Sequence, residues 1–333
     1  MYTEPLFCYT IQPMSNLPQI IVVCGPTATG KSALAVELAR LFNGEVISAD
    51  SRQVYTGLDI GSAKITQDEM KGIPHYLIDV AHPNDYFSVA DFQKLAQEKI
   101  QDIHSRGKLP IICGGTGMYI DAVIYDMQFP DVSVNLELRT ELEQLSAPEL
   151  FEKLQDLDPG RALEIDEHNP VRLIRAIEIA TELGKVPKLA VIPDLIRNPE
   201  FKDNILDSGS EAGMTITNKT LWIGLNLPKE ELQERIEKRI SDRIPALFDE
   251  INHLHESGVT FEKLYSFGLE YRFGSDYIQG NITLEEFKEL LAIKTWQFAK
   301  RQMTWFKRNQ NIHWFDLIID QQKILKLVQD FLS

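Results

Sequence analysis

The chain has 333 residues, of which 44% are hydrophobic and 25% are charged, as in an ordinary soluble globular protein. Its length suggests two domains, or one domain with a large insertion. The net charge of −15 excludes a protein that coats nucleic acid by bulk electrostatics, because neutralising phosphates requires clustered lysine and arginine.

Targeting signals and cysteine pairs are not evident in the sequence. No apolar run approaches the roughly 18 to 20 residues that a membrane span needs, and the first residues lack the basic-then-apolar pattern of a secretory signal. The three cysteines form no CxxC pair, which indicates neither a disulfide framework nor a zinc site. We therefore expect a cytoplasmic protein with no membrane partner.

The first half of the chain has the pattern of an α/β protein. Residues 1–16 show no periodicity, and we expect a disordered N-terminal arm. From Gln19 to Ile124, apolar runs alternate with helical stretches such as Val89–Arg106, which predicts a parallel sheet with helices on both faces. The predicted strands are Gln19–Cys24, Glu45–Ser48, Tyr76–Val80 and Leu109–Cys113.

A helical block interrupts this pattern. After Pro130 the sequence becomes charged and Leu-rich, and Leu221–Leu227 then resembles a sheet strand again. We therefore predict an all-helical insertion domain at 130–219 within an α/β core made of 17–129 and 220–333. Its predicted helices are Leu136–Leu145, Ala147–Leu154 and Val171–Leu183. Proline, glycine and polar residues dominate 191–218, which we expect to be a disordered, dispensable loop.

A phosphate-binding pattern follows the first predicted strand. The eight residues match G-x-x-x-x-G-K-[ST] and open a helical stretch, which is the context of a P-loop. Its backbone N–H groups and Lys31 would hold a phosphate, and the Ser32 hydroxyl would bind a magnesium ion carried by that phosphate. The alternative is a glycine-rich turn without a ligand. The residues are Gly25, Pro26, Thr27, Ala28, Thr29, Gly30, Lys31 and Ser32.

Two more predicted strands end in residues that could take part in catalysis or ligand binding. Asp50 follows the second strand, and Gly114–Tyr119 contains a glycine-rich turn with the hydroxyl of Thr116. The carboxyl ends of parallel strands line one crevice, so both should face the phosphate loop. Asp50 could bind magnesium or act as a general base. Taken alone, however, an aspartate at a strand end is as often structural, and a glycine-rich turn is structural more often than that.

A basic segment lies near the C-terminus. Between Lys294 and Gln310 the chain has no acidic residue, and aromatic residues alternate with the basic ones. A helix here would align Lys294, Arg301 and Arg308 on one stripe, and Lys300 and Lys307 on another. Such a helix can hold an RNA backbone, but a core helix with buried aromatic residues and solvated lysines explains the same pattern.

Eight segments, in this order, resemble the tRNA dimethylallyltransferase family, also called the tRNA isopentenyltransferases. The resemblance covers 19–316 apart from 191–218, which is more specific than the phosphate loop alone. The segments are Gly25–Ser32, Asp50–Lys64, Pro74–Asp79, Phe87–Phe92, Gly114–Tyr119, Asn169–Glu178, Arg235–Arg239 and Ala299–Trp305.

The resemblance implies a reaction and roles for its residues. The family transfers a dimethylallyl group from dimethylallyl diphosphate to the exocyclic amino nitrogen of adenine 37 in tRNAs that read codons beginning with U. The phosphate loop would then hold the diphosphate leaving group, with Mg²⁺ as the cofactor. Asp50 would be the base, Arg239 would stabilise the leaving group, and Thr116 would orient the adenine or the base.

The same resemblance implies contacts with the anticodon stem-loop of tRNA. A monomer that binds one tRNA is the simplest expectation. The family commonly has glycine at the position of Glu270, so the turn should be rearranged, with Gly268 supplying the flexibility. The matching residues are Asp50, Ser51, Arg52, Gln53, Thr116, Arg139, Val171, Arg172, Leu173, Ile174, Arg175, Phe267, Gly268, Leu269, Glu270, Tyr271 and Arg272.

Two other functions compete with this interpretation. A P-loop small-molecule kinase would place ATP in the loop and use Asp50 as the base for a substrate hydroxyl, with the helical insertion as its lid. A non-catalytic RNA-binding protein would explain the basic segment, but it would have no need of a phosphate loop.

Overall fold

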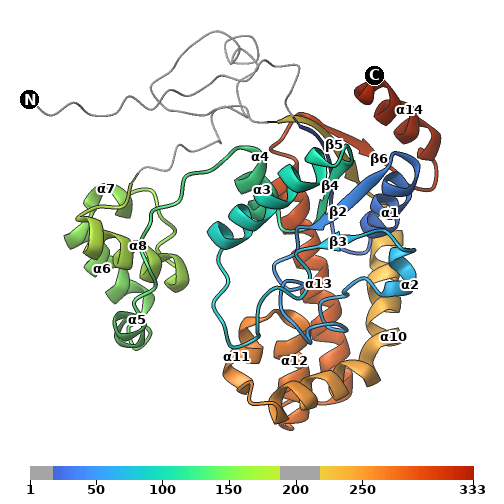
Figure 1. The fold of residues 1–333 in the computed structure, drawn as a ribbon. Coiled ribbons are helices and arrows are strands. Elements are labelled where there is room, and N and C mark those ends of the chain that lie inside the picture. Colours follow the sequence, from blue (N-terminus) through green and yellow to red (C-terminus); the bar gives the residue numbers. More distant parts are fainter. Residues whose placement is uncertain (1–17, 188–217) are drawn as a thin grey trace, which may run out of the picture. The chain divides into compact units, whose positions relative to one another are not determined.

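The fold is taken from a computed structural model that describes residues 18–187 and 218–333 (Figure 1). The predicted N-terminal arm, 1–16, lies outside the described residues, as do residues 191–217 of the predicted loop. The chain divides into two compact units. One consists of Met1–Asp126 with Pro193–Ser333, and the other is Met127–Ile192.

The first unit is built on a six-stranded sheet in which every strand pair is parallel, as predicted. The strand order is β3-β2-β4-β1-β5-β6, and Val22 in β1 lies opposite Ile112 in β4 and Trp222 in β5. The carboxyl ends of the strands therefore lie at one edge. The strands are β1 (Gln19–Cys24), β2 (Gly44–Ser48), β3 (His75–Tyr76), β4 (Leu109–Gly114), β5 (Lys219–Leu225) and β6 (Ile312–Phe315).

Helices cover both faces of this sheet because the buried strands are apolar on both sides. Ile21 and Val23 pack with residues of α1 (Lys31–Leu41) and α14 (Gln321–Leu332). Ile20 and Val22 belong to a larger cluster on the opposite face. That cluster includes α3 (Val89–Ser105) and α4 (Gly117–Ile124), together with helices from the C-terminal part of the chain.

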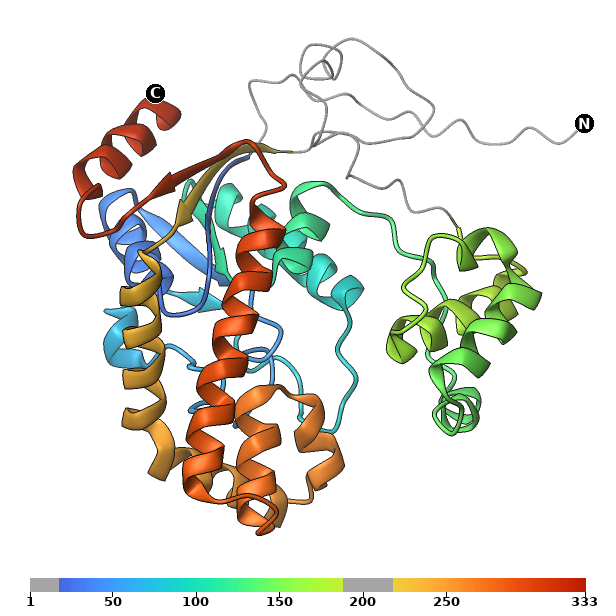
Figure 2. The same ribbon diagram turned by 180° about the vertical axis from the view of Figure 1, so that it is seen from behind.

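The C-terminal helices of the first unit pack against one another and extend the larger cluster. Figures 1 and 2 both show α10 and α13 side by side, with α12 next to them. Among the described residues, no helix is long and apolar enough to cross a membrane. The helices are α10 (Lys229–Glu256), α11 (Phe261–Ser266), α12 (Leu269–Ile278) and α13 (Leu284–Phe306), and the short α2 (Gln67–Met70) precedes β3.

The described residues of the second unit form helices around a separate small core. Leu142, Leu150, Leu154, Leu173 and Ile177 are buried there at 1% exposure or less. Asparagine side chains cap two of the helices, with Asn135 accepting from Leu138 N and Asn169 from Arg172 N. The helices are α5 (Leu136–Leu142), α6 (Ala147–Leu157), α7 (Pro159–Ala162) and α8 (Pro170–Leu183).

Several elements differ from the sequence predictions. The strand predicted at Tyr76–Val80 is wrong beyond Tyr76, because Leu77 and Asp79 have φ angles of 61° and 56° that no strand accommodates. The alignment considered for a helix over Lys294–Gln310 is incomplete, because α13 ends at Phe306 and Lys307 and Arg308 lie beyond it. Strand β6 was not predicted at all.

Candidate active site

The Gly25–Ser32 loop joins β1 to α1 at the carboxyl edge of the sheet. Gly25 has a φ of 135°, and a Cβ there would lie 2.4 Å from the carbonyl oxygen of Leu225. Gly30 has a φ of 91° and precedes α1 as its N-cap without a side chain to satisfy the helix N–H groups. The helix therefore presents free N–H donors and the positive end of its dipole, which suit an anion.

Lys31 adds a positive charge to this loop. Its Nζ donates a hydrogen bond of 2.6 Å to the carbonyl oxygen of Pro26. Burial lowers the pKa of the Lys31 ammonium group, while the nearby Asp50 carboxylate opposes this shift. Ser32 is exposed in the first turn of α1. The loop thus combines backbone donors, a poorly hydrated cation and an accessible hydroxyl.

Two distant helices reach the loop at Thr27. Arg239, from α10, donates from Nη1 to Thr27 Oγ1 at 2.7 Å. Gln302, from α13, accepts from Thr27 N at 2.9 Å and donates to the carbonyl oxygen of Gly115 at 3.0 Å. Gln302 therefore links the Gly25–Ser32 loop to the glycine-rich turn after β4.

Asp50 and Thr116 lie at the ends of neighbouring strands, β2 and β4. Asp50 Oδ1 accepts from Arg52 N at 2.8 Å, and Thr116 Oγ1 accepts from Ser51 N at 3.1 Å. The strand ends approach closely because Gly114 has no side chain, and a Cβ there would lie 2.1 Å from the carbonyl oxygen of Ala49. Thr116 thus helps to fix the turn that carries Asp50.

The turn that contains Gly268 and Glu270 also lies near Arg239, which contacts the Gly25–Ser32 loop. Gly268 has a φ of 124°, a backbone conformation that favours glycine, and Glu270 lies in the first turn of α12. Burial raises the pKa of the Glu270 carboxyl group, and the nearby guanidinium groups of Arg239 and Arg243 oppose this shift. Glu270 thus lies close to the arginine that contacts Thr27.

The predicted tRNA contacts near Glu270 divide into core and surface side chains. Phe267 and Tyr271 are only 2% and 1% exposed, whereas Arg272 is exposed. Gly268, Leu269 and Glu270 are half-buried. Of the six residues 267–272, Arg272 alone has an exposed side chain.

The second unit has a comparable division around a buried carboxylate. Arg139 donates to Glu178 from Nε at 2.8 Å and from Nη2 at 2.9 Å, and Arg175 donates from Nη1 at 3.2 Å. Against the effect of burial, these bonds lower the pKa of Glu178. Leu173 and Ile174 are buried, while Val171 and Arg172 are exposed.

The site thus brings together residues that are far apart in the sequence. Thr27, Lys31, Asp50, Thr116 and Arg239 all lie at one edge of the sheet in the first unit. Sequence reasoning assigned no role to Gln302, although it lies in the Ala299–Trp305 segment. A glutamine inside a helical pattern has no spacing that sets it apart, and only the folded chain reveals its two partners.

Known proteins are similar to this chain in both sequence and fold. The IPP transferase family matches residues 53–309. The tRNA dimethylallyltransferase of Caldanaerobacter subterraneus subsp. tengcongensis is 41% identical over 304 residues, which cover 89% of this chain and 91% of the relative. That of Halalkalibacterium halodurans is 38% identical over 322 residues, which cover 95% and 96%.

Solved structures of transferases with similar names have folds similar to that of this chain. The tRNA isopentenylpyrophosphate transferase from Bacillus halodurans has a TM-score of 0.65 and 37% identity, with 94% of this chain and 95% of that chain covered. A eukaryotic dimethylallyltransferase acting on tRNA has a TM-score of 0.74 and 26% identity, with 95% of this chain and 80% of that chain covered.

Proposed function

Because the chain belongs to the IPP transferase family, it is an enzyme that transfers a dimethylallyl group to tRNA, and we propose its donor and acceptor atom. The donor is dimethylallyl diphosphate. The acceptor is the exocyclic amino nitrogen of adenine 37 in tRNAs that read codons beginning with U. The observation that carries this proposal is the placement of the Gly25–Ser32 loop and Arg239 at the same sheet edge as the Asp50 carboxylate.

The Gly25–Ser32 loop is proposed to hold the diphosphate of the donor. When the allylic C–O bond breaks, its electron pair stays on the diphosphate, so negative charge grows there. The N–H groups at the start of α1, Lys31 and Arg239 supply positive charge for it. The hydrogen bond from Arg239 to Thr27 supports this role, because it ties the guanidinium group to the loop itself.

The loop also fits a magnesium ion that arrives with the diphosphate. No group of three or more His, Cys, Asp or Glu side chains in the described parts of the chain could hold a metal ion. The exposed hydroxyl of Ser32 would bind magnesium together with diphosphate oxygens, because magnesium prefers oxygen ligands. Bound there, magnesium would neutralise charge on the leaving group.

Asp50 is proposed as the general base on the acceptor side. The hydrogen bond from Arg52 N holds Oδ1 and thereby orients the second carboxylate oxygen. As the new C–N bond forms, one amino proton passes to the Asp50 carboxylate and the diphosphate departs. Thr116, which fixes the backbone at Ser51, would keep Asp50 in place.

Local positive charge would hold the tRNA on this acidic chain. Three exposed basic side chains in and just after α13 lie over aromatic rings. Lys300 lies 5.9 Å from the ring centroid of Trp296, and Arg301 lies 5.9 Å from that of Phe298. Arg308 lies 5.2 Å from the ring centroid of Trp305. Such cations can meet phosphates, and the exposed arginines Arg172 and Arg272 would add contacts. Affinity for tRNA should then fall steeply with salt.

The proposal is tested by incubating the protein with tRNA and dimethylallyl diphosphate, followed by nucleoside analysis. Isopentenyladenosine should form without ATP. A parallel sample with ATP in place of the prenyl donor addresses the kinase alternative. ATP consumption or a phosphorylated product, with no prenylated adenosine in the first sample, would favour the kinase.

A further inference from the structure

One carboxylate of α10 receives an unusual set of hydrogen bonds from the loop that begins with Asp50. Glu250 Oε2 accepts from Asp59 N at 2.8 Å and from Ile60 N at 2.6 Å, and Oε1 accepts from Gly61 N at 3.0 Å. Three successive backbone N–H groups therefore converge on one side chain that is about 190 residues away in sequence. Bonds to a charged acceptor are stronger than neutral ones.

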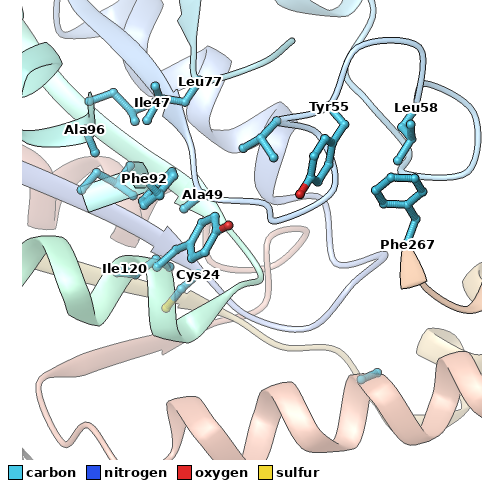
Figure 3. Packing of buried hydrophobic residues seen from close by; sticks show 14 of the residues in the cluster. Cys24, Ile47, Ala49, Tyr55, Leu58, Leu77, Phe92, Ala96, Ile120 and Phe267 are labelled. Carbon is cyan, nitrogen blue, oxygen red and sulfur yellow. The ribbon is translucent and has the colours of Figure 1, made fainter. Parts of the chain in front are cut away.

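Tyr271 completes this anchor from α12. Its hydroxyl donates to Glu250 Oε1 at 2.7 Å, and its side chain is only 1% exposed. Gly61 lies directly against the ring, since a Cβ there would be 2.5 Å from Tyr271 Cζ. Nearer the start of the loop, the ring of Tyr55 packs against that of Phe267, with 4.9 Å between the ring centroids (Figure 3). The loop is thus held at several points by the C-terminal helices.

The anchored part of the loop is connected to the turn at Asp50. Gln53 Nε2 donates to the carbonyl oxygens of Ser62 at 3.4 Å and Ala63 at 3.2 Å, directly after the three residues that Glu250 binds. Gln53 also donates its backbone N–H to Asp50 Oδ1 at 3.4 Å. A displacement of residues 59–61 would therefore reach Asp50 through Ser62, Ala63 and Gln53.

We propose that Glu250 is a positioning residue for the acceptor side of the reaction, assisted by Tyr271. It fixes the Asp50–Lys64 loop so that Asp50 meets the adenine amino group. No hydrogen bond of Glu250 reaches the Gly25–Ser32 loop. This inference rests on the proposed function. It predicts that the loss of Glu250 lowers kcat/KM for tRNA and leaves KM for dimethylallyl diphosphate nearly unchanged.

The test compares Glu250→Ala, Glu250→Gln and Tyr271→Phe in steady-state assays with each substrate varied. Glu250→Ala should lower kcat/KM for tRNA by about thirtyfold, while KM for dimethylallyl diphosphate changes less than about twofold. Glu250→Gln keeps one acceptor oxygen and should lose less, and Tyr271→Phe, which removes a single hydroxyl, should lose least. Asp249→Ala is the matched control, because Asp249 is exposed on the same helix and should leave both parameters unchanged.

Limited trypsin digestion gives a second measurement that does not depend on activity. The loop contains Arg52 and Lys64, and cleavage after these residues should accelerate in Glu250→Ala under conditions where the remaining chain stays folded by circular dichroism. A rise in KM for dimethylallyl diphosphate as large as the loss of kcat/KM for tRNA, or an unchanged loop-cleavage rate in folded Glu250→Ala, would overturn the inference. If the wild-type protein made no isopentenyladenosine, the proposed function would fail first, and the digestion would still report on the anchor.

Discussion

Replacing Gln302 by methionine should weaken the donor side of the reaction. The side chain is 7% exposed and makes two hydrogen bonds, to Thr27 N and to the carbonyl oxygen of Gly115. Methionine has a similar volume but makes neither bond. Each neutral hydrogen bond contributes about 1 kcal/mol, and a buried group left unpaired costs about 1–3 kcal/mol, so we expect a loss of about 2 kcal/mol.

This loss should appear partly in stability and partly in KM for dimethylallyl diphosphate. Gln302 fixes Thr27, and Thr27 is the acceptor for Arg239, so the charges that meet the diphosphate become less well placed. We expect an increase in KM for the donor of about tenfold, with a smaller effect on KM for tRNA. Gln297→Met, on the same helix, is the control. A folded Gln302→Met protein with the donor KM of its control would refute this reasoning.

The remaining predictions concern the base and two carboxyl groups with shifted pKa values. Asp50→Ala should cut turnover by about 10² while tRNA affinity in a filter-binding assay stays within a few-fold; unchanged turnover would remove Asp50 from its role. Burial raises the pKa of Asp121 to about 6, so its ionisation lowers the free energy of unfolding as the pH rises from 3.8 towards 6. Asp121→Asn still accepts from Trp305 Nε1 and should raise the free energy of unfolding above pH 6 by about 1 kcal/mol, with no gain near pH 4 in urea titrations. Hydrogen bonds from Arg106 and Lys108 lower the pKa of Glu45 to about 2, so this stabilisation is complete above pH 4.5 and is lost as the pH falls towards 2. Glu45→Gln should lower the free energy of unfolding at pH 7 by about 2 kcal/mol and weaken this acid dependence; an unchanged acid dependence would argue against the contribution of Glu45.

Elements with strong local patterns could be predicted from the sequence. The run Gln19–Cys24 is apolar throughout and coincides with β1, and the helix predicted at Val89–Arg106 differs from α3 by one residue. Ser88 marks the start of this helix, because its side chain caps the helix together with Asp91. Buried strands and capped helices carry their own signals in neighbouring residues.

Other features depend on contacts between distant residues. Leu77 has a positive φ although its neighbours resemble a strand, and it is 6% exposed in the larger core cluster, so tertiary packing overrides local preference there. The sheet order also cannot be read from one sequence. Glu250 and Gln302 are ordinary polar residues in helical patterns, and only their partners in the folded chain distinguish them.

The position of the prenyl group on the tRNA tests the account most directly. Wild-type protein and Asp50→Ala would each be given full-length tRNA with dimethylallyl diphosphate, and the products would be mapped by nuclease digestion and mass spectrometry. The account predicts one dimethylallyl group on the amino nitrogen of adenine 37, formed about 10² times more slowly by Asp50→Ala. A prenyl group at another position, or equal rates for the two proteins, would contradict it.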